Sequence, residues 1–314
     1  MDIFHKTIIY KFYAVALIPY CSWVLELPNF DLYTEAIFHP CNYIGICDSY
    51  LVEKMWQLGV EKAFFLPDAI ELGEPIRTIP KQREFCFITK YSQELLKTEE
   101  MTLYGKGYLD SFLHAQRVLY GASILETGLT KRVYQEFIKD KIIPNDILLD
   151  MQKLFVADRY LAPVCTGMQQ EILLKNNENI MTVYSNYDFS MCNFQKYPYV
   201  EEEQERRKIY AEKEFTLVLT PHVFHNAISR DALEVVAAGG FPICGFQKDY
   251  AYFFQKDENL SYFTNPSEFS QAIIRYGNNH EERERVRQNV YNMVANGHTY
   301  QHRIVNMLEM WEKL

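Results

Sequence analysis

The sequence lacks the features that define several protein classes. Its seven cysteines include no CxxC pair, and several stand in apolar runs such as YIGIC and FPIC. This distribution indicates buried free thiols in a reducing compartment. No basic stripe with interleaved aromatic residues is present, and the net charge of −9 argues against a nucleic-acid partner. Internal repeats and low-complexity tracts are also absent from the sequence.

Long apolar runs are missing as well. The run FYAVALIPYCSWV, which follows Lys6 and Lys11, loosely resembles a signal peptide. However, it contains Pro19, lacks a small-residue cleavage site and falls short of the ~20 apolar residues that span a bilayer. We therefore interpret this run as a helix followed by a buried strand, and we predict a cytoplasmic protein without a membrane span.

Metal and P-loop signatures are not found either. Two histidine pairs, His222/His225 and His298/His302, have intervals that could suit a metal, but neither has a carboxylate or thiol nearby in the sequence. We therefore predict structural roles for these pairs and no metal site. The glycines of the segment YGKGY do not form a P-loop, because a P-loop needs a longer spacing and a following Lys-Ser/Thr.

What the chain does have is length and apolar content. Its 314 residues, 48% of them hydrophobic, suit two domains of ordinary size. In the first half, strand-like runs alternate with helical runs, and Asp48 and Ser49 are placed to cap a helix that stops at Gly59. Strands are predicted at 18–25, 43–47, 62–66 and 83–88, and the helix at 50–58. This βαβ alternation predicts an α/β fold with a parallel, Rossmann-like sheet.

The second half repeats the alternation after a mostly helical region at 109–176. Strands are predicted at 179–185, 217–220 and 241–244, and helices at 266–277, 281–295 and 300–314. We therefore predict two Rossmann-like domains that face a cleft. Residues 1–175 form the first domain with its helical connector, residues 176–296 form the second, and 297–314 form a terminal helix that packs back on the first.

The most informative stretch is 217–246, in which a buried-looking strand leads through a polar loop (221–228) to a helix that opens at Ser229 and Arg230. Backbone N–H groups and the helix dipole favour anions at such a helix start. An arginine in the first turn opposes the dipole, so it indicates a phosphate bound between the two. The alternative is a surface arginine in an ordinary βαβ unit.

The same helix carries a carboxylate and ends at a double glycine. Glu234 stands among Leu233, Val235 and Val236, which favours a ribose contact over a carboxylate that merely faces water. Gly239 and Gly240 would allow either close packing of helix against strand or close approach of the backbone to a nucleotide. The residues themselves leave both alternatives open.

Several short motifs occur in an order and spacing that resemble one family. They are Trp23-Val-Leu-Glu26-Leu-Pro28, Ile44-Gly-Ile-Cys-Asp48, Leu66-Pro67-Asp68-Ala69, Gly107-Tyr-Leu-Asp110 with Ala115-Gln116, Ala227-Ile-Ser229-Arg230 through Gly239-Gly240-Phe241, and His298-Thr299-Tyr300 with Arg303. In these motifs the chain resembles the CgeB-type (spore maturation) glycosyltransferases and, more distantly, the large retaining family with the GT-B fold. The resemblance runs through most of the chain.

This resemblance implies a GT-B-like fold with a C-terminal crossover helix and a nucleoside-diphosphate sugar held by the second domain. Arg230 would then neutralise the leaving group without an obligatory metal. Glu26 is a candidate base or acceptor anchor, with a loop-capping carboxylate as the simpler alternative. We predict donor contacts from His225, Asn226, Ser229, Arg230, Glu234, Gly239 and Gly240. A UDP-sugar is the favoured donor, because UDP is the commonest carrier in proteins of this kind, and the acceptor is unidentified.

Two departures from the family pattern favour an alternative function. The wider family embraces the donor with two acidic residues seven apart; Glu234 fits the second place, but Asn226 stands in the first. Residues 1–24 resemble a later part of the family's N-terminal domain, so this half is expected to be abbreviated or completed by a partner chain. The alternative is a non-catalytic sugar- or nucleotide-binding partner derived from a glycosyltransferase. A phosphosugar isomerase or epimerase is less favoured, because no carboxylate pair or histidine is placed for its proton chemistry.

Overall fold

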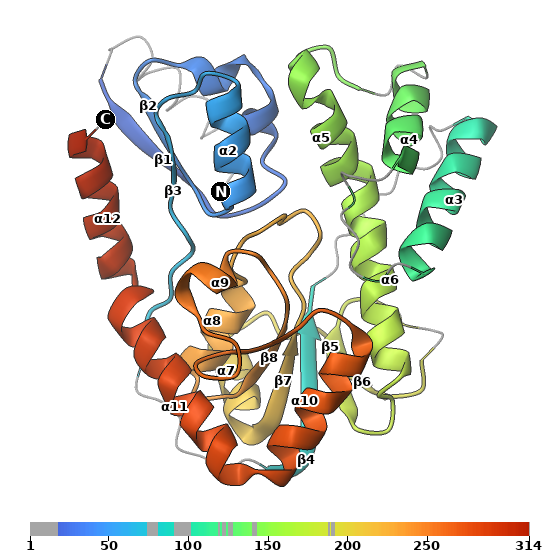
Figure 1. Cartoon of the computed structure of the whole chain (residues 1–314), viewed down its shortest axis with the longest axis vertical. Coiled ribbons are helices and arrows are strands. Elements are labelled where there is room, and N and C mark those ends of the chain that lie inside the picture. The colour runs from blue at the N-terminus through green and yellow to red at the C-terminus, as the bar shows by residue number, and fades with distance from the viewer. Residues whose placement is uncertain are drawn as a thin grey trace.

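The chain folds around two parallel sheets, one three-stranded and one six-stranded (Figure 1). This computed structural model describes residues 18–73, 81–90, 102–118, 120, 124, 128–139, 143–187, 189 and 192–313. The helix that we expect before residue 18 lies outside these ranges. The predicted α/β fold with parallel sheets is confirmed.

The smaller sheet has the order β1-β2-β3 and is built from β1 (Tyr20–Val24), β2 (Asn42–Ile46) and β3 (Ala63–Phe65). Two 3-10 helices, η1 (Phe30–Tyr33) and η2 (Glu35–Phe38), connect β1 to β2. Helix α2 (Ser49–Gln57) follows β2. Its start is fixed as predicted, because the Asp48 carboxylate accepts hydrogen bonds from two backbone N–H groups of the first turn.

The larger sheet has the order β6-β5-β4-β7-β8-β9. Its strands are β4 (Lys81–Thr89), β5 (Met181–Ser185), β6 (Gln195–Tyr197), β7 (Lys213–Val218), β8 (Pro242–Gly245) and β9 (Ser261–Phe263). When these six strands are numbered 1 to 6 by their order in the chain, they follow the doubly wound order 3-2-1-4-5-6. The direction in which strands are added reverses between β4 and β7. In β4, β7 and β8, neighbouring residues enter two separate hydrophobic cores on opposite faces of the sheet; in β4, Cys86 faces one core and Phe87 the other.

The strand order corrects the predicted domain division. We predict β4 as part of the first domain, but it pairs with β5 and β7 at the centre of the larger sheet. Phe85 of β4 lies beside Phe215 of β7, with the two ring centroids 4.8 Å apart. A run of strands and helices along the sequence does not say which sheet a strand joins, because pairing is set by contacts between distant residues.

The chain then returns to the smaller sheet through a helical region. This region contains α3 (Leu103–Val118), α4 (Gly128–Lys139), η5 (Leu149–Met151), α5 (Gln152–Val156) and a π-helical turn, η6 (Ala157–Leu161). Phe112, Phe137 and Phe155 share one buried core with Ile44 and Ile46 of β2. We call the described residues of 18–73 and 102–161 the first lobe, and those of 81–90 and 162–297 the second lobe.

Helices cover both faces of the larger sheet. One face packs against α7 (Glu203–Glu212), α8 (Arg230–Ala237) and α11 (His280–Gly297), and the other against α6 (Ala162–Lys175) and α10 (Pro266–Asn278). The short helix α9 (Tyr250–Phe253) follows β8. These helices leave the carboxyl ends of the strands facing the first lobe (Figure 1).

The last helix, α12 (Tyr300–Lys313), runs back along the first lobe (Figure 1). The Arg303 guanidinium donates to the carbonyl oxygen of Pro67 at 3.0 Å, and the Trp311 ring stacks on Tyr43 with centroids 4.7 Å apart. None of the helices in the described ranges is long and apolar enough to cross a membrane.

Candidate functional site

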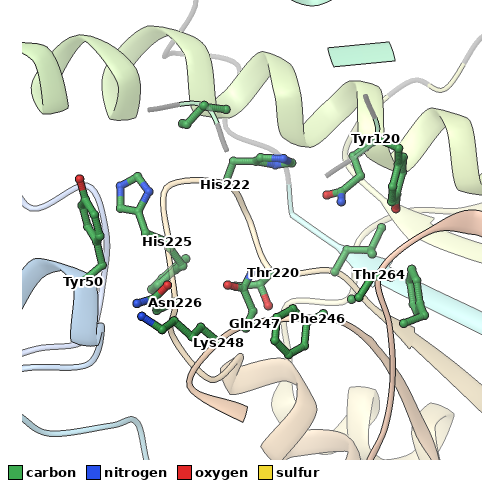
Figure 2. Close-up of a pocket in the computed structure, with 16 residues that line it drawn as sticks. Tyr50, Tyr120, Thr220, His222, His225, Asn226, Phe246, Gln247, Lys248 and Thr264 are labelled. Atoms are coloured by element: carbon green, nitrogen blue, oxygen red, sulfur yellow. The ribbon is translucent and has the colours of Figure 1, made fainter. Parts of the chain in front are cut away.

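A pocket of about 420 Å³ opens at the carboxyl ends of β7, β8 and β9 (Figure 2). Loops at this edge of a doubly wound sheet, beside the point where the strand order reverses, are the usual place for ligands. The lining residues are Tyr50, Tyr120, Ile124, Gln169, Leu219, Thr220, His222, Phe224, His225, Asn226, Gly245, Phe246, Gln247, Lys248, Phe263 and Thr264. Tyr50 belongs to α2, so both lobes contribute to the pocket.

The lining combines aromatic rings with polar groups. Figure 2 shows Tyr50, His225, Asn226 and Lys248 toward one end of the pocket, and Tyr120 toward the other. Aromatic surface suits a base or the apolar face of a sugar, whereas amide, hydroxyl and ammonium groups suit hydroxyls and phosphates. The pocket can therefore hold a polar ligand that carries both a ring and negative charge.

The loop after β7 carries two histidines that differ in their affinity for protons. Burial, together with the neighbouring His225, lowers the pKa of His222 to about 4. Burial also lowers the pKa of His225, but the Asp158 carboxylate outweighs it, so the pKa of His225 lies above its ordinary value. The pocket therefore contains one neutral imidazole and one that is readily protonated.

Asp158 is the partner that the sequence analysis missed. It is 1% exposed, lies in the π-helical turn η6, and its Oδ1 is 2.9 Å from His225 Nε2. The Tyr33 hydroxyl donates to its Oδ2 at 2.6 Å. No carboxylate stands near His225 in the sequence, because its partner comes from a segment 67 residues away.

Asp48 connects the two lobes beside the pocket. Its side chain is 0% exposed. Oδ1 accepts from the backbone N–H groups of Tyr50 and Leu51, whereas Oδ2 accepts from those of Asn226 and Ala227 at 3.0 and 3.3 Å. We call residues 219–229, between β7 and α8, the pocket loop. One carboxylate thus caps α2 in the first lobe and accepts hydrogen bonds from two backbone amides of the pocket loop in the second.

A second contact between the lobes lies next to Asp48. The Ser49 hydroxyl donates to Asp249 Oδ1 at 2.5 Å, and Asn226 Nδ2 donates to Ser49 Oγ at 2.9 Å. Burial raises the pKa of Asp249 to about 6, although the hydrogen bonds from Ser49 lower it. Asn226 is therefore held by both its backbone and its side chain.

Arg230 and Glu234 lie on α8, outside the pocket lining. Arg230 Nη1 is 3.5 Å from Asp68 Oδ1, and 41% of its side chain is exposed. The two Glu234 carboxylate oxygens accept from Nε and Nη2 of Arg206, each at 3.1 Å. A ribose that bound Glu234 would have to displace Arg206.

Gly239 and Gly240 require a correction. They precede β8 and therefore lie at its amino end, at the opposite edge of the sheet from the pocket. A Cβ atom at Gly240 would lie 2.8 Å from the carbonyl oxygen of Tyr210, and Gly239 has a φ of 81°. The structure therefore supports close packing of helix and strand, not contact with a nucleotide.

Two other predicted residues lie outside the pocket lining. Glu26 is exposed in the loop after β1. Ser229 is the buried N-cap of α8, and its backbone N–H donates to the Tyr250 hydroxyl at 3.3 Å. Of the predicted donor contacts, His225 and Asn226 are the ones that line the pocket.

Metal binding has no obvious ligand set in the described ranges. No group of three or more His, Cys, Asp or Glu side chains is placed there to hold a metal ion. The metal independence that we expect from the sequence stays a prediction.

We expect Asp48→Asn to destabilise the protein. An asparagine has a single acceptor oxygen, which can still cap α2. Its NH2 group cannot accept from the backbone N–H groups of Asn226 and Ala227, so these two buried N–H groups lose their partner. Leaving such a group unsatisfied costs about 1–3 kcal/mol. Urea denaturation measures the loss in free energy of unfolding, with the exposed Asp146→Asn as the control. Equal stability of the two variants would contradict the importance of the contact.

Comparison with known families finds a similarity that lies mostly in the second lobe. A family model described as glycosyl transferase-like matches residues 170–309, which include β5 to β9 and the loops of the pocket. No curated protein sequence shows significant similarity to the chain. The CgeB-type subfamily therefore stays a prediction.

Solved structures match the chain at low identity. HepE from Anabaena in complex with UDP matches with a TM-score of 0.52 at 9% identity, over 97% of this chain and 75% of that one. HepE in complex with UDP and glucose matches with a TM-score of 0.50 at 8% identity, over 98% and 75%. A glycosyltransferase from Rickettsia africae matches over 93% and 70%, at 9% identity and a TM-score of 0.44. This chain has the α/β fold of GT-B glycosyltransferase structures, and its residues 170–309 are similar to the glycosyl transferase-like family.

Proposed function

We propose that this chain transfers a sugar from a nucleoside-diphosphate sugar to an acceptor, with the donor bound in the pocket. The observation that carries the proposal is the position of the pocket. It lies at the carboxyl edge of the doubly wound sheet, within the segment that matches the glycosyl transferase-like family. Its volume of about 420 Å³ falls in the range of small-molecule sites.

The lining gives each part of such a donor a partner. Phe224 and Phe246 offer aromatic surface to a base or sugar ring, and Gln247 and Asn226 offer amides to hydroxyl groups. Lys248 and the readily protonated His225 offer positive charge to the diphosphate. With the diphosphate bound beside these cations, the side chains would stabilise the leaving group without an obligatory metal.

UDP is the carrier that we propose. The two HepE structures with the same fold contain UDP, one of them with glucose. The proposal for UDP therefore rests on that likeness and on the family resemblance of the sequence.

Arg230 is proposed as a further countercharge for the diphosphate. It begins α8 four residues after Asn226, which lines the pocket, and part of its side chain is exposed. A diphosphate that extends from the pocket toward the start of α8 would meet both the guanidinium and the helix dipole. Asp68 and Glu234 hold the guanidinium in place before the donor binds.

A thermal-shift panel with UDP, GDP, ADP and TDP tests the site and the base. We expect UDP to raise the melting temperature, because a ligand at a hundredfold excess over its dissociation constant stabilises the native state by about 2.7 kcal/mol. A shift with GDP alone would change the base but keep the site. If folded protein shows no shift with any nucleotide, the enzyme proposal fails. Binding without turnover of any donor would favour the non-catalytic alternative.

We expect Arg230→Ala to lower donor turnover by about 10²-fold, the usual effect of removing one group that stabilises a leaving charge. Arg230→Lys should lose less, because it keeps the positive charge. The measurement is UDP release from UDP-glucose by parent and variants, with the exposed Arg285→Ala on α11 as the control. If Arg230→Ala keeps the rate of the parent, the proposed role of the residue is lost.

A further inference from the structure

A buried network of Tyr33, Asp158 and His225 ends at the pocket. Tyr33 comes from η1, Asp158 from the π-helical turn η6 and His225 from the loop after β7, so three distant segments meet. The side chains of Asp158 and His225 are 1% and 8% exposed. π-helical turns recur at functional sites, and this one carries a carboxylate to the junction of the two lobes.

The surroundings of His225 favour its protonated form. Asp158 accepts its Nε2–H, and the Tyr33 hydroxyl keeps one Asp158 oxygen hydrogen-bonded as a carboxylate. The Asp48 carboxylate also acts on His225 through space, the Tyr50 ring lies 4.8 Å away, and His222 of the same loop stays neutral near pH 7. Apart from His222, each of these groups belongs to the first lobe.

The second ring nitrogen of His225 is left for a ligand. Nε2 is taken by Asp158, whereas Nδ1 has no hydrogen-bond partner among the residues that the structure describes. His225 also lines the pocket. A protonated His225 carries an N–H at Nδ1 as well, and an anion in the pocket would give that N–H a charged acceptor. A buried ion pair of this kind is weak evidence for a purely stabilising role.

We propose that His225, oriented and charged by Asp158 and Tyr33, is a cation that binds the donor's diphosphate through Nδ1–H, beside Lys248, and stabilises it as it leaves. This inference rests on the proposed function and names the group that acts at its site. His225 is the residue that would touch the substrate. Asp158 and Tyr33 act through His225 and are positioning residues.

The chemical step balances without proton transfer from the histidine. The bond between the anomeric carbon and the diphosphate oxygen breaks, and its electron pair stays on the oxygen. The acceptor oxygen bonds to the anomeric carbon, and the acceptor proton passes to solvent. His225 keeps its proton and donates a hydrogen bond to the oxygen that gains charge, which is electrostatic stabilisation in a largely buried site. A general-base role would instead need a neutral His225.

The test is UDP affinity by calorimetry between pH 5.5 and 9. In the parent, affinity should fall as pH rises through the folded-state pKa of His225, which lies above 6.5. His225→Gln should bind at least tenfold more weakly at pH 6 and should lose this step. The protonation of UDP also changes with pH, but this change is the same for the parent and for His225→Gln. The difference between the pH profiles of the two proteins therefore reports the contribution of His225.

Two further variants test the positioning residues. Asp158→Asn removes the charge that raises the pKa of His225, so the step should move to lower pH. Burial raises the pKa of Asp158, and the Tyr33 hydrogen bond opposes this rise. Tyr33→Phe should therefore raise the pKa of Asp158 further and reduce the negative charge beside His225, so the step should move in the same direction by less. Asp150→Asn, exposed in the same segment, should keep the parent's profile. A merely structural role would lower the melting temperature and leave the pH profile in place.

The outcomes separate this inference from the proposed function. If the parent binds UDP and His225→Gln has the same affinity and pH profile, the role of His225 is overturned while the function stands. If the folded parent does not bind UDP at any pH, both are overturned. Tyr33→Phe still tests the network if Asp158→Asn fails to fold, because the tyrosine loses only a hydroxyl group.

Discussion

The arrangement of the two lobes depends on one buried carboxylate. Asp48 is fully buried and accepts four backbone N–H groups, two at the start of α2 and two in the loop between β7 and α8. A buried charge is stable only when its hydrogen-bonding capacity is satisfied, and here neither lobe satisfies it alone. The same residue therefore fixes the start of a helix, the path of the pocket loop and the approach of the two sheets.

Residues of the first lobe hold the pocket loop by hydrogen bonds at two places. Asp48 and Ser49 hold Asn226 on one side, and Asp158 with Tyr33 holds His225 on the other. Because the side chains of Asp158 and His225 are both buried, the electrostatic effect of Asp158 on His225 is stronger than it would be at the surface. The raised pKa of His225 thus depends on the contact between the two lobes and not on the loop sequence alone.

Local features could be predicted from the sequence, and contacts between distant segments could not. Asp48 and Gly59 delimit α2, and Asn265 followed by Pro266 opens α10, because capping depends on neighbouring residues. The membership of β4 in the larger sheet and the partnership of Asp158 with His225 depend on contacts between residues far apart in the chain. As a sequence pattern, the double glycine before β8 fits close packing of helix against strand and close approach to a nucleotide equally well. The carbonyl oxygen of Tyr210 beside Gly240 supports close packing.

The central claim is that a nucleotide binds at the carboxyl edge of β7 and β8, in the loops that the first lobe holds. Hydrogen–deuterium exchange of the full chain with and without UDP tests it directly. The account predicts slower exchange of the amides in 219–227 and 245–249 with UDP, and unchanged exchange at 238–241, at the opposite edge of the sheet. Protection confined to 238–241, or protection that spares both pocket loops, would contradict it.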